Sequence, residues 1–285
     1  MAIDTAFLQT LDTFSLIVNK RVTSNYVGER KSLFFGRGLT FKDHRIYVPG
    51  DDIRLVDWKV YARTDDLYIK RFEEERNLSV HILVDDSASM NFGSPATKYE
   101  YASMLGIGFA YLALKSNEKF QFATFADRLD LFTPRRGMHQ LASMVQHLNT
   151  AKPRGVTKFS ETVAQYRKLV NSRSFITIMS DFLFPIEDIE KGLYLIADGH
   201  DMKVVQVLDR VERDMALQGD LRLKDSESSS MLRTFISQRL RSNYQNMLEE
   251  HIAKVQKLCN QLGIEFYSIT TDTPLFDAFF EMLKE

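Results

Sequence analysis

Oxygen-bearing side chains that could share one site occur at three separate places in this sequence. The first is a D-x-S-x-S stretch, in which Asp85, Ser87 and Ser89 come directly after an apolar run. Thr157 lies behind a glycine in a second stretch, and Asp181 ends a third, apolar one. Two carboxylates and three hydroxyls form the all-oxygen ligand set that hard cations prefer, and two negative charges balance one divalent ion. The sequence therefore predicts a site for Mg²⁺, or for Mn²⁺ or Ca²⁺, that remains open to a carboxylate of a partner protein.

The same residues also allow two other interpretations. In a metal-dependent phosphatase or phosphotransfer enzyme, Asp85 would be the nucleophile beside the metal, although such a loop would carry a second aspartate in place of Ser87. Alternatively, Asp85 and Asp86 only cap a loop, and we expect this role for Asp86. No G-x-S-x-G motif and no zinc spacing of Cys and His is present. We therefore expect a protein without catalytic residues and keep the phosphatase as the alternative.

The elements that must position these residues alternate along the chain from about residue 79. Apolar runs typical of strands covered on both faces span residues 79–85, 120–126, 174–181, 203–209 and 264–271. Helical patterns span residues 98–115, 138–148, 159–170, 186–199 and 231–262. This alternation predicts an α/β fold, a doubly wound and mostly parallel sheet flanked by helices. Ligands of such sheets bind at the carboxyl ends of the strands, where the predicted metal ligands lie.

The first 78 residues have a different pattern. Apolar positions between residues 7 and 18 suggest a helix, and β-like pieces follow, with a turn at residues 49–52 and a short helix over residues 53–60. We therefore expect an N-terminal α+β extension, residues 1–78, packed on an α/β domain, residues 79–285. The alternating charges between Asp51 and Arg63 favour an internal ion-pair network. The alternative is a docking surface with Trp58 as its aromatic anchor.

Composition and charge limit the class of protein. The 285 residues are 44% hydrophobic and 26% charged, and the net charge of −1 creates no general attraction to nucleic acid or to an anionic membrane. The longest apolar stretch, residues 104–114, is shorter than the roughly 20 residues that a membrane span needs. The N-terminus has no signal-peptide pattern, and the single cysteine, Cys259, fits a reducing compartment. We expect a cytoplasmic protein with no nucleic-acid partner and no membrane span.

Two basic stretches, residues 133–137 and 151–155, are short and contain no interleaved aromatic residues, so neither indicates a nucleic-acid interface. The second precedes Thr157. There, Lys152 or Arg154 would help to select an acidic partner at the ion.

The combination of a D-x-S-x-S loop, a threonine from a second loop and an aspartate from a third resembles the metal-ion-dependent adhesion site of von Willebrand factor type A domains. The resemblance implies that the two serines ligate the cation directly, that the threonine helps to hold it, and that the two carboxylates act largely through water. The sequence departs from the pattern at one position. Many such domains have a glycine after the third-loop aspartate, whereas this chain has Phe182.

A longer stretch, residues 36–90, resembles a family of bacterial and archaeal proteins with a von Willebrand A-like core, catalogued as domain-of-unknown-function family fifty-eight. Residues 219–228 and 259–275 also resemble that family, so the similarity covers most of the chain. Its members are often encoded beside MoxR-type AAA+ ATPases, and no established activity comes with the name. The resemblance implies a non-enzymatic interaction module that acts as an adaptor or co-chaperone of such an ATPase.

Overall fold

The structure is a computed structural model in two compact units. It describes residues 8, 11, 39–49, 51, 53–74, 79–116, 118–132, 138–215, 219–224 and 231–283. One unit comprises residues 20–77, and the other comprises residues 1–19 together with residues 78–285. Within the described residues, no helix combines the length and the apolar composition that a membrane crossing requires.

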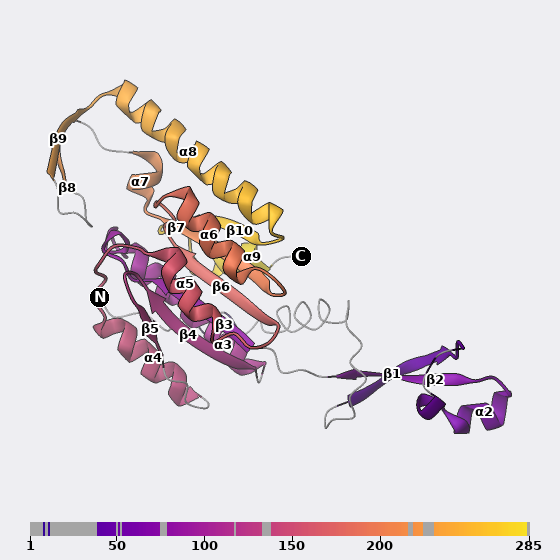
Figure 1. Cartoon of the computed structure of the whole chain (residues 1–285). Coiled ribbons are helices and arrows are strands. Elements are labelled where there is room, and N and C mark those ends of the chain that lie inside the picture. Colours follow the sequence, from indigo (N-terminus) through magenta and orange to yellow (C-terminus); the bar gives the residue numbers. More distant parts are fainter. Residues whose placement is uncertain are drawn as a thin grey trace. The chain divides into compact units, whose positions relative to one another are not determined.

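The larger unit is built on a six-stranded sheet in the order β10-β7-β6-β3-β4-β5 (Figure 1). Its strands are β3 (Ser79–Asp85), β4 (Lys119–Phe125), β5 (Leu129–Leu131), β6 (Ser174–Ser180), β7 (Asp201–Leu208) and β10 (Glu265–Thr270). Every pair is parallel except β4 with β5, the short edge strand. The chain leaves β3 toward one edge and returns at β6 to build the other, so the sheet is doubly wound, as predicted. The five predicted strands are confirmed within two residues of their expected bounds.

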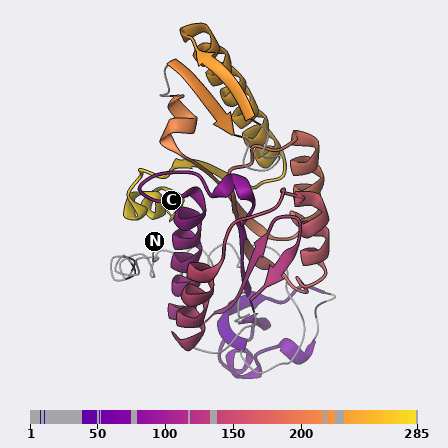
Figure 2. The same ribbon diagram turned by 90° about the vertical axis from the view of Figure 1, so that its left-hand side faces the viewer.

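Helices cover both faces of this sheet (Figure 2). One face carries α3 (Lys98–Lys115), α4 (Met138–Thr150) and α9 (Leu275–Leu283), and the other carries α5 (Phe159–Arg167), α6 (Ile186–Ile196) and α8 (Gln238–Gln261). Side chains from the apolar run of β3 pack against the helices on both faces of the sheet. Ile82 and Val84 lie against Gly106 of α3, whereas Leu83 belongs to the core cluster formed with α5, α6 and α8. Burial on both faces is why the strands are continuously apolar.

The predicted helix over residues 231–262 is wrong in its first part. Residues Met231–Ile236 form strand β9, which pairs antiparallel with β8 (Gly219–Lys224), and α8 begins only at Gln238. Ser237 separates the two elements, because its side chain accepts a hydrogen bond from the Leu240 backbone and caps the helix. The polar loop expected at residues 225–231 lies outside the described residues except for Met231.

The smaller unit contains an antiparallel pair of strands and two short helices. These are β1 (Leu39–Ile46), η2 (Ile53–Leu55), α2 (Trp58–Thr64) and β2 (Tyr68–Glu74). Asp57 caps α2 by accepting from the Lys59 backbone, and it also lies 2.9 Å from His44 Nε2. Arg45 pairs with Asp51 at 2.8 Å. Several charges of the predicted network are therefore paired, while Trp58 is exposed.

Little of the predicted N-terminal helix falls among the described residues. Of its apolar positions, Leu8 and Leu11 are described, and Leu11 is fully buried beside Gly108 of α3. The rest of that helix and the basic stretch over residues 133–137 lie outside the described part of the chain.

Candidate metal centre

The first loop of the candidate site begins where β3 ends. The Ser87 backbone N–H donates to Asp85 Oδ1 at 2.9 Å, and both residues are fully buried. Ser87 precedes the short helix η3 (Ala88–Met90), and its Oγ lies 3.1 Å from Ser89 Oγ. The D-x-S-x-S spacing therefore brings the two hydroxyls together. Asp86, between Asp85 and Ser87 in the sequence, accepts a hydrogen bond from the Arg154 N–H through its backbone carbonyl.

A backbone hydrogen bond connects the second loop to the first. The Ala88 N–H donates to the Gly155 carbonyl at 3.0 Å. Gly155 has a φ of +87°, which favours glycine, and a Cβ there would lie 2.9 Å from Asp127 Oδ1. This loop carries Thr157, whose Oγ1 donates to Asp85 Oδ2 at 3.4 Å. The glycine before Thr157 is thus what allows the loop to approach the site.

The third loop follows β6. Ser180 Oγ donates to Asp85 Oδ2 at 2.6 Å, and Ser89 Oγ donates to Asp181 Oδ2 at 2.8 Å. Phe182, at the position where a glycine is common in the resembling domains, has a φ of +50°. Its carbonyl accepts a hydrogen bond from His251 Nε2 at 2.6 Å. The loop therefore adopts the left-handed conformation typical of glycine even though the residue is phenylalanine.

All five predicted residues are brought together in one hydrogen-bonded cluster: Asp85, Ser87, Ser89, Thr157 and Asp181. Ser180 completes it by linking the end of β6 to Asp85. The sequence places Ser180 in the predicted strand just before Asp181, but Ser180 was not among the predicted ligands. We call these six residues the oxygen cluster.

The two carboxylates of the oxygen cluster interact electrostatically. Burial, and next the charge of Asp181, raise the pKa of Asp85 to about 7. Carboxylates placed this close are stabilised by a cation, and hydroxyl oxygens are suitable neutral ligands for Mg²⁺. Among the described residues, no group of three or more His, Cys, Asp and Glu could hold a metal. A cation here would therefore depend on the hydroxyls as well as on the two carboxylates, and the donor set fits a hard divalent cation.

A buried lysine beside the oxygen cluster was not predicted. Lys98, the first residue of α3, is 1% exposed, and its Nζ lies 2.9 Å from both Asp181 Oδ2 and Glu212 Oε1. Burial opposes its charge, but Asp181 and Glu212 outweigh burial and raise the pKa of Lys98 above its usual value. Glu212 lies on the short helix α7 (Arg210–Asp214). Nothing in the local sequence distinguishes Lys98 from a solvated helical lysine, because its burial arises only in the folded chain.

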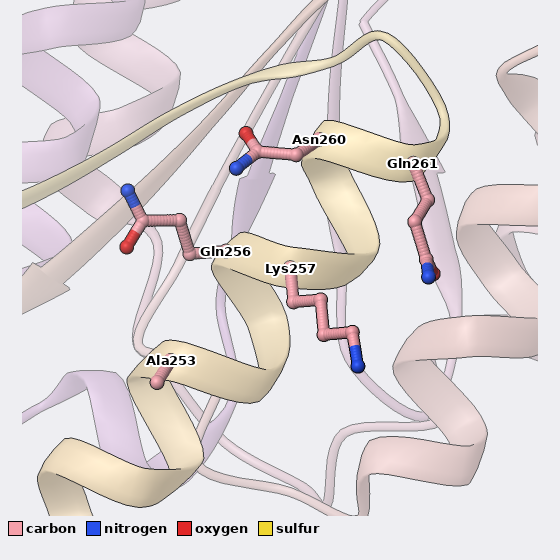
Figure 3. Close-up of a pocket in the computed structure, with 5 residues that line it drawn as sticks. All are labelled: Ala253, Gln256, Lys257, Asn260 and Gln261. Atoms are coloured by element: carbon pink, nitrogen blue, oxygen red, sulfur yellow. The ribbon is translucent and has the colours of Figure 1, made fainter.

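A separate pocket lies away from the oxygen cluster (Figure 3). It is lined by residues on the exposed side of α8, namely Ala253, Gln256, Lys257, Asn260 and Gln261. Helix α8 ends at Gln261, and β10 begins at Glu265, so this pocket is near the amino-end edge of the sheet. The oxygen cluster lies at the opposite, carboxyl-end edge, and the pocket contains none of its residues.

Known proteins resemble this chain in sequence and in fold. Uncharacterized protein Rv1480 of Mycobacterium tuberculosis (strain ATCC 25618 / H37Rv) is 28% identical over 276 residues, covering 94% of this chain and 86% of the relative. Uncharacterized protein YeaD of Bacillus subtilis (strain 168) is 26% identical over 156 residues, covering 52% of this chain and 37% of the relative.

Two solved structures show a likeness of fold. BatB from Bacteroides thetaiotaomicron has a TM-score of 0.46 at 17% identity, covering 72% of this chain and 96% of that one. A von Willebrand factor type A protein from Catenulispora acidiphila has a TM-score of 0.45 at 13% identity, covering 76% and 44%. Residues 43–254 match the family described as "Protein of unknown function DUF58", and the chain belongs to that family.

Proposed function

We propose that this protein is a divalent-cation-dependent interaction module that binds an acidic side chain of a partner protein. The observation that carries the proposal is the convergence of three loops on one cluster of hydroxyls and buried carboxylates at the carboxyl ends of β3 and β6. Mg²⁺, Mn²⁺ or Ca²⁺ bound there would supply a Lewis-acidic position for an incoming carboxylate. Ser87, Ser89 and Thr157 would hold the cation, and Asp85 and Asp181 would balance its charge.

The surroundings of the oxygen cluster suit a protein partner. Three large apolar side chains lie within three residues of a predicted ligand and are 41–48% exposed: Phe92, Val156 and Leu183. Exposed apolar groups beside a polar centre are typical of interaction sites. Arg154 is exposed in the same loop as Thr157 and would attract negative charge. The partner segment we expect is an acidic residue flanked by apolar ones.

We further propose that the partner is a MoxR-type AAA+ ATPase and that the chain serves it as an adaptor or co-chaperone. This part of the proposal depends on the family resemblance.

Purified ATPase from the same organism would be captured on immobilised wild-type chain in Mg²⁺ and, separately, in EDTA. We expect capture in Mg²⁺, loss in EDTA, and loss in Thr157→Ala but not in Ser143→Ala, whose hydroxyl bonds within α4. Capture that is insensitive to EDTA and to Thr157→Ala would contradict metal-dependent binding of the ATPase.

The phosphatase alternative is not favoured by the geometry. A nucleophilic carboxylate must reach a substrate phosphorus, but Asp85 is fully buried and both of its oxygens accept hydrogen bonds. Lys98 supplies the lysine that such enzymes need, but it contacts Asp181 and Glu212. We expect no turnover of p-nitrophenyl phosphate in Mg²⁺. Turnover that disappears in Asp85→Asn would restore the enzyme hypothesis.

A further inference from the structure

Lys98 occupies a position that is unfavourable for a cation in two respects. It is the first residue of α3, where the partial positive charge of the helix terminus opposes a cation. Its side chain is also almost completely buried, which removes the ammonium from water. Among the residues that the structure describes, the carboxylates of Asp181 and Glu212, both at 2.9 Å from the ammonium, offset these costs. The position is therefore best explained by what Lys98 does to those two acids.

Asp181 Oδ2 is shared between Lys98 and the oxygen cluster. The same oxygen accepts one hydrogen bond from Lys98 Nζ, at 2.9 Å, and another from Ser89 Oγ, at 2.8 Å. Lys98 thus neutralises one of the two carboxylates that would balance a divalent cation. Its backbone N–H donates to the Phe92 carbonyl at 2.8 Å, and Thr97 and Glu100 form a capping box at the start of α3, so the lysine is held in place.

Glu212 gives the ammonium a second partner outside the oxygen cluster. Its Oε1 accepts from Lys98, while its Oε2 accepts from the backbone N–H of Asp209, which caps α7. Lys98 can therefore keep its ion pair with Glu212 when Asp181 interacts with a divalent cation instead.

We propose that the Lys98 ammonium is a built-in competitor of the divalent cation for Asp181, and that it keeps the cation affinity of the oxygen cluster low. This inference rests on the proposed metal site. A single positive charge a few ångströms from a divalent ion in a buried site lowers affinity by about tenfold or more. The partner's carboxylate would then strengthen a weak metal site, so cation and partner would bind cooperatively.

The test compares Mn²⁺ dissociation constants, measured by electron paramagnetic resonance of free Mn²⁺, for wild type and Lys98→Met. We expect Lys98→Met to bind Mn²⁺ about tenfold or more tightly. Damage to the site would weaken binding, so the expected direction separates competition from a merely structural role. Lys158→Met is the matched control, because Lys158 is next to Thr157 but has a 52% exposed side chain. Its loss should change the affinity less than twofold.

Lys98→Met/Glu212→Gln tests whether net charge alone explains the result. The double variant removes one positive and one negative charge and does not leave Glu212 as an unpaired buried acid, so it also serves if the single variant folds poorly. Competition for Asp181 predicts that the double variant still binds Mn²⁺ more tightly than wild type. An affinity equal to or weaker than wild type in both variants would overturn the inference.

The outcomes separate this inference from the proposed function. If Lys98→Met binds Mn²⁺ and wild type does not, Lys98 is the resident cation and the metal-dependent function of the natural chain is wrong. If wild type binds Mn²⁺ and Lys98→Met does not bind it more tightly, the proposed metal site is supported and the proposed competition by Lys98 is wrong. If neither binds, both are wrong.

Discussion

Phe182 holds a left-handed backbone conformation immediately after Asp181, with a φ of +50°. A non-glycine residue in this region costs about 1–2 kcal/mol. The ring offsets that cost, because it is fully buried and packs against Phe159 and Phe184 at centroid distances of 5.8 Å. The buried ring therefore allows phenylalanine to adopt this conformation at the position where the resembling domains often have glycine.

This conformation predicts an unusual order of stability at residue 182. Phe182→Ala should lower the free energy of unfolding by about 3–5 kcal/mol through loss of the buried ring. Phe182→Gly loses the same ring but removes the backbone strain, so it should be about 1 kcal/mol more stable than Phe182→Ala. Urea denaturation measures both. An alanine variant as stable as the glycine variant would show that the left-handed conformation is not present.

His81 predicts a pH dependence of stability. Burial, and next the charge of His200, lower the pKa of His81 to about 4, and its Nδ1 lies 2.7 Å from the Tyr166 hydroxyl. Above pH 6.5 the imidazole is neutral in both the folded and the unfolded chain, so its contribution to stability is fully present. Between pH 6.5 and 4 only the unfolded chain gains the proton, and the free energy of unfolding should fall by about 3 kcal/mol.

The control for this dependence is His81→Gln, which has no titrating group at the position. Its free energy of unfolding at pH 7 should be lower than that of wild type, but it should lose this part of the decline between pH 6.5 and 4. Parallel stability curves for the two proteins would contradict the assignment to His81.

At the residue scale, five members of the oxygen cluster could be predicted, but the buried lysine beside them could not. Asp85, Ser87 and Asp181 follow apolar strands directly, so the order of types along the chain indicated a common edge of the sheet. Lys98 carries no such signal, because a lysine at the start of a helix is usually solvated. Its burial depends on Glu212, 114 residues away in the sequence.

At the element scale, two glycines determine how closely α3 packs. A Cβ at Gly106 would lie 2.8 Å from the Phe122 ring, and one at Gly108 would lie 2.3 Å from the Phe279 ring of α9. The glycines therefore permit the close packing expected from the sequence. Because α3 begins with Lys98, this packing also helps to hold the lysine near the oxygen cluster.

Gly108→Ala should lower the free energy of unfolding by about 1–3 kcal/mol, because the added methyl group overlaps a fully buried ring. The matched test is the pair Gly108→Ala/Phe279→Leu. The smaller leucine should recover part of the loss, so the double variant should be more stable than the sum of the single effects predicts. Strict additivity in thermal denaturation would contradict the contact.

The antiparallel pair β8–β9 shows where helical periodicity misleads. The apolar stripe of α8 continues in register into residues 231–236, but Thr234, Phe235 and Ile236 are residue types that favour strands. Ser237 marks the true start of the helix. The sequence predicts a cap at Ser237 only if the residues before it are assigned to a strand.

At the scale of the whole molecule, the doubly wound order of the sheet brings the oxygen cluster together. β3 and β6 are neighbours in the sheet although 88 residues lie between Asp85 and Ser174, and β7 follows on the far side of β6. The strand–helix alternation predicted this class of fold. The oxygen cluster takes residues from both sides of the point where the strand order reverses. Ions and small molecules bind to doubly wound sheets at this point.

Cation binding should therefore stabilise the fold as a whole. At a free Mg²⁺ concentration about ten times the dissociation constant, the free energy of unfolding should rise by about 1.4 kcal/mol. For a chain of this size the melting temperature should rise by about 2–3 °C. EDTA should reverse the rise, and Thr157→Ala should show little of it. An equal rise in Thr157→Ala would indicate binding elsewhere.

The central claim is that the oxygen cluster binds one divalent cation, and direct titration tests it. Isothermal titration of Mg²⁺ or Mn²⁺ into wild type, Ser87→Ala and Ser143→Ala compares a cluster hydroxyl with a matched hydroxyl on α4. The account predicts one site per chain in wild type and in Ser143→Ala, and an affinity at least about tenfold weaker in Ser87→Ala. Binding that is absent from wild type, or undiminished in Ser87→Ala, would contradict it.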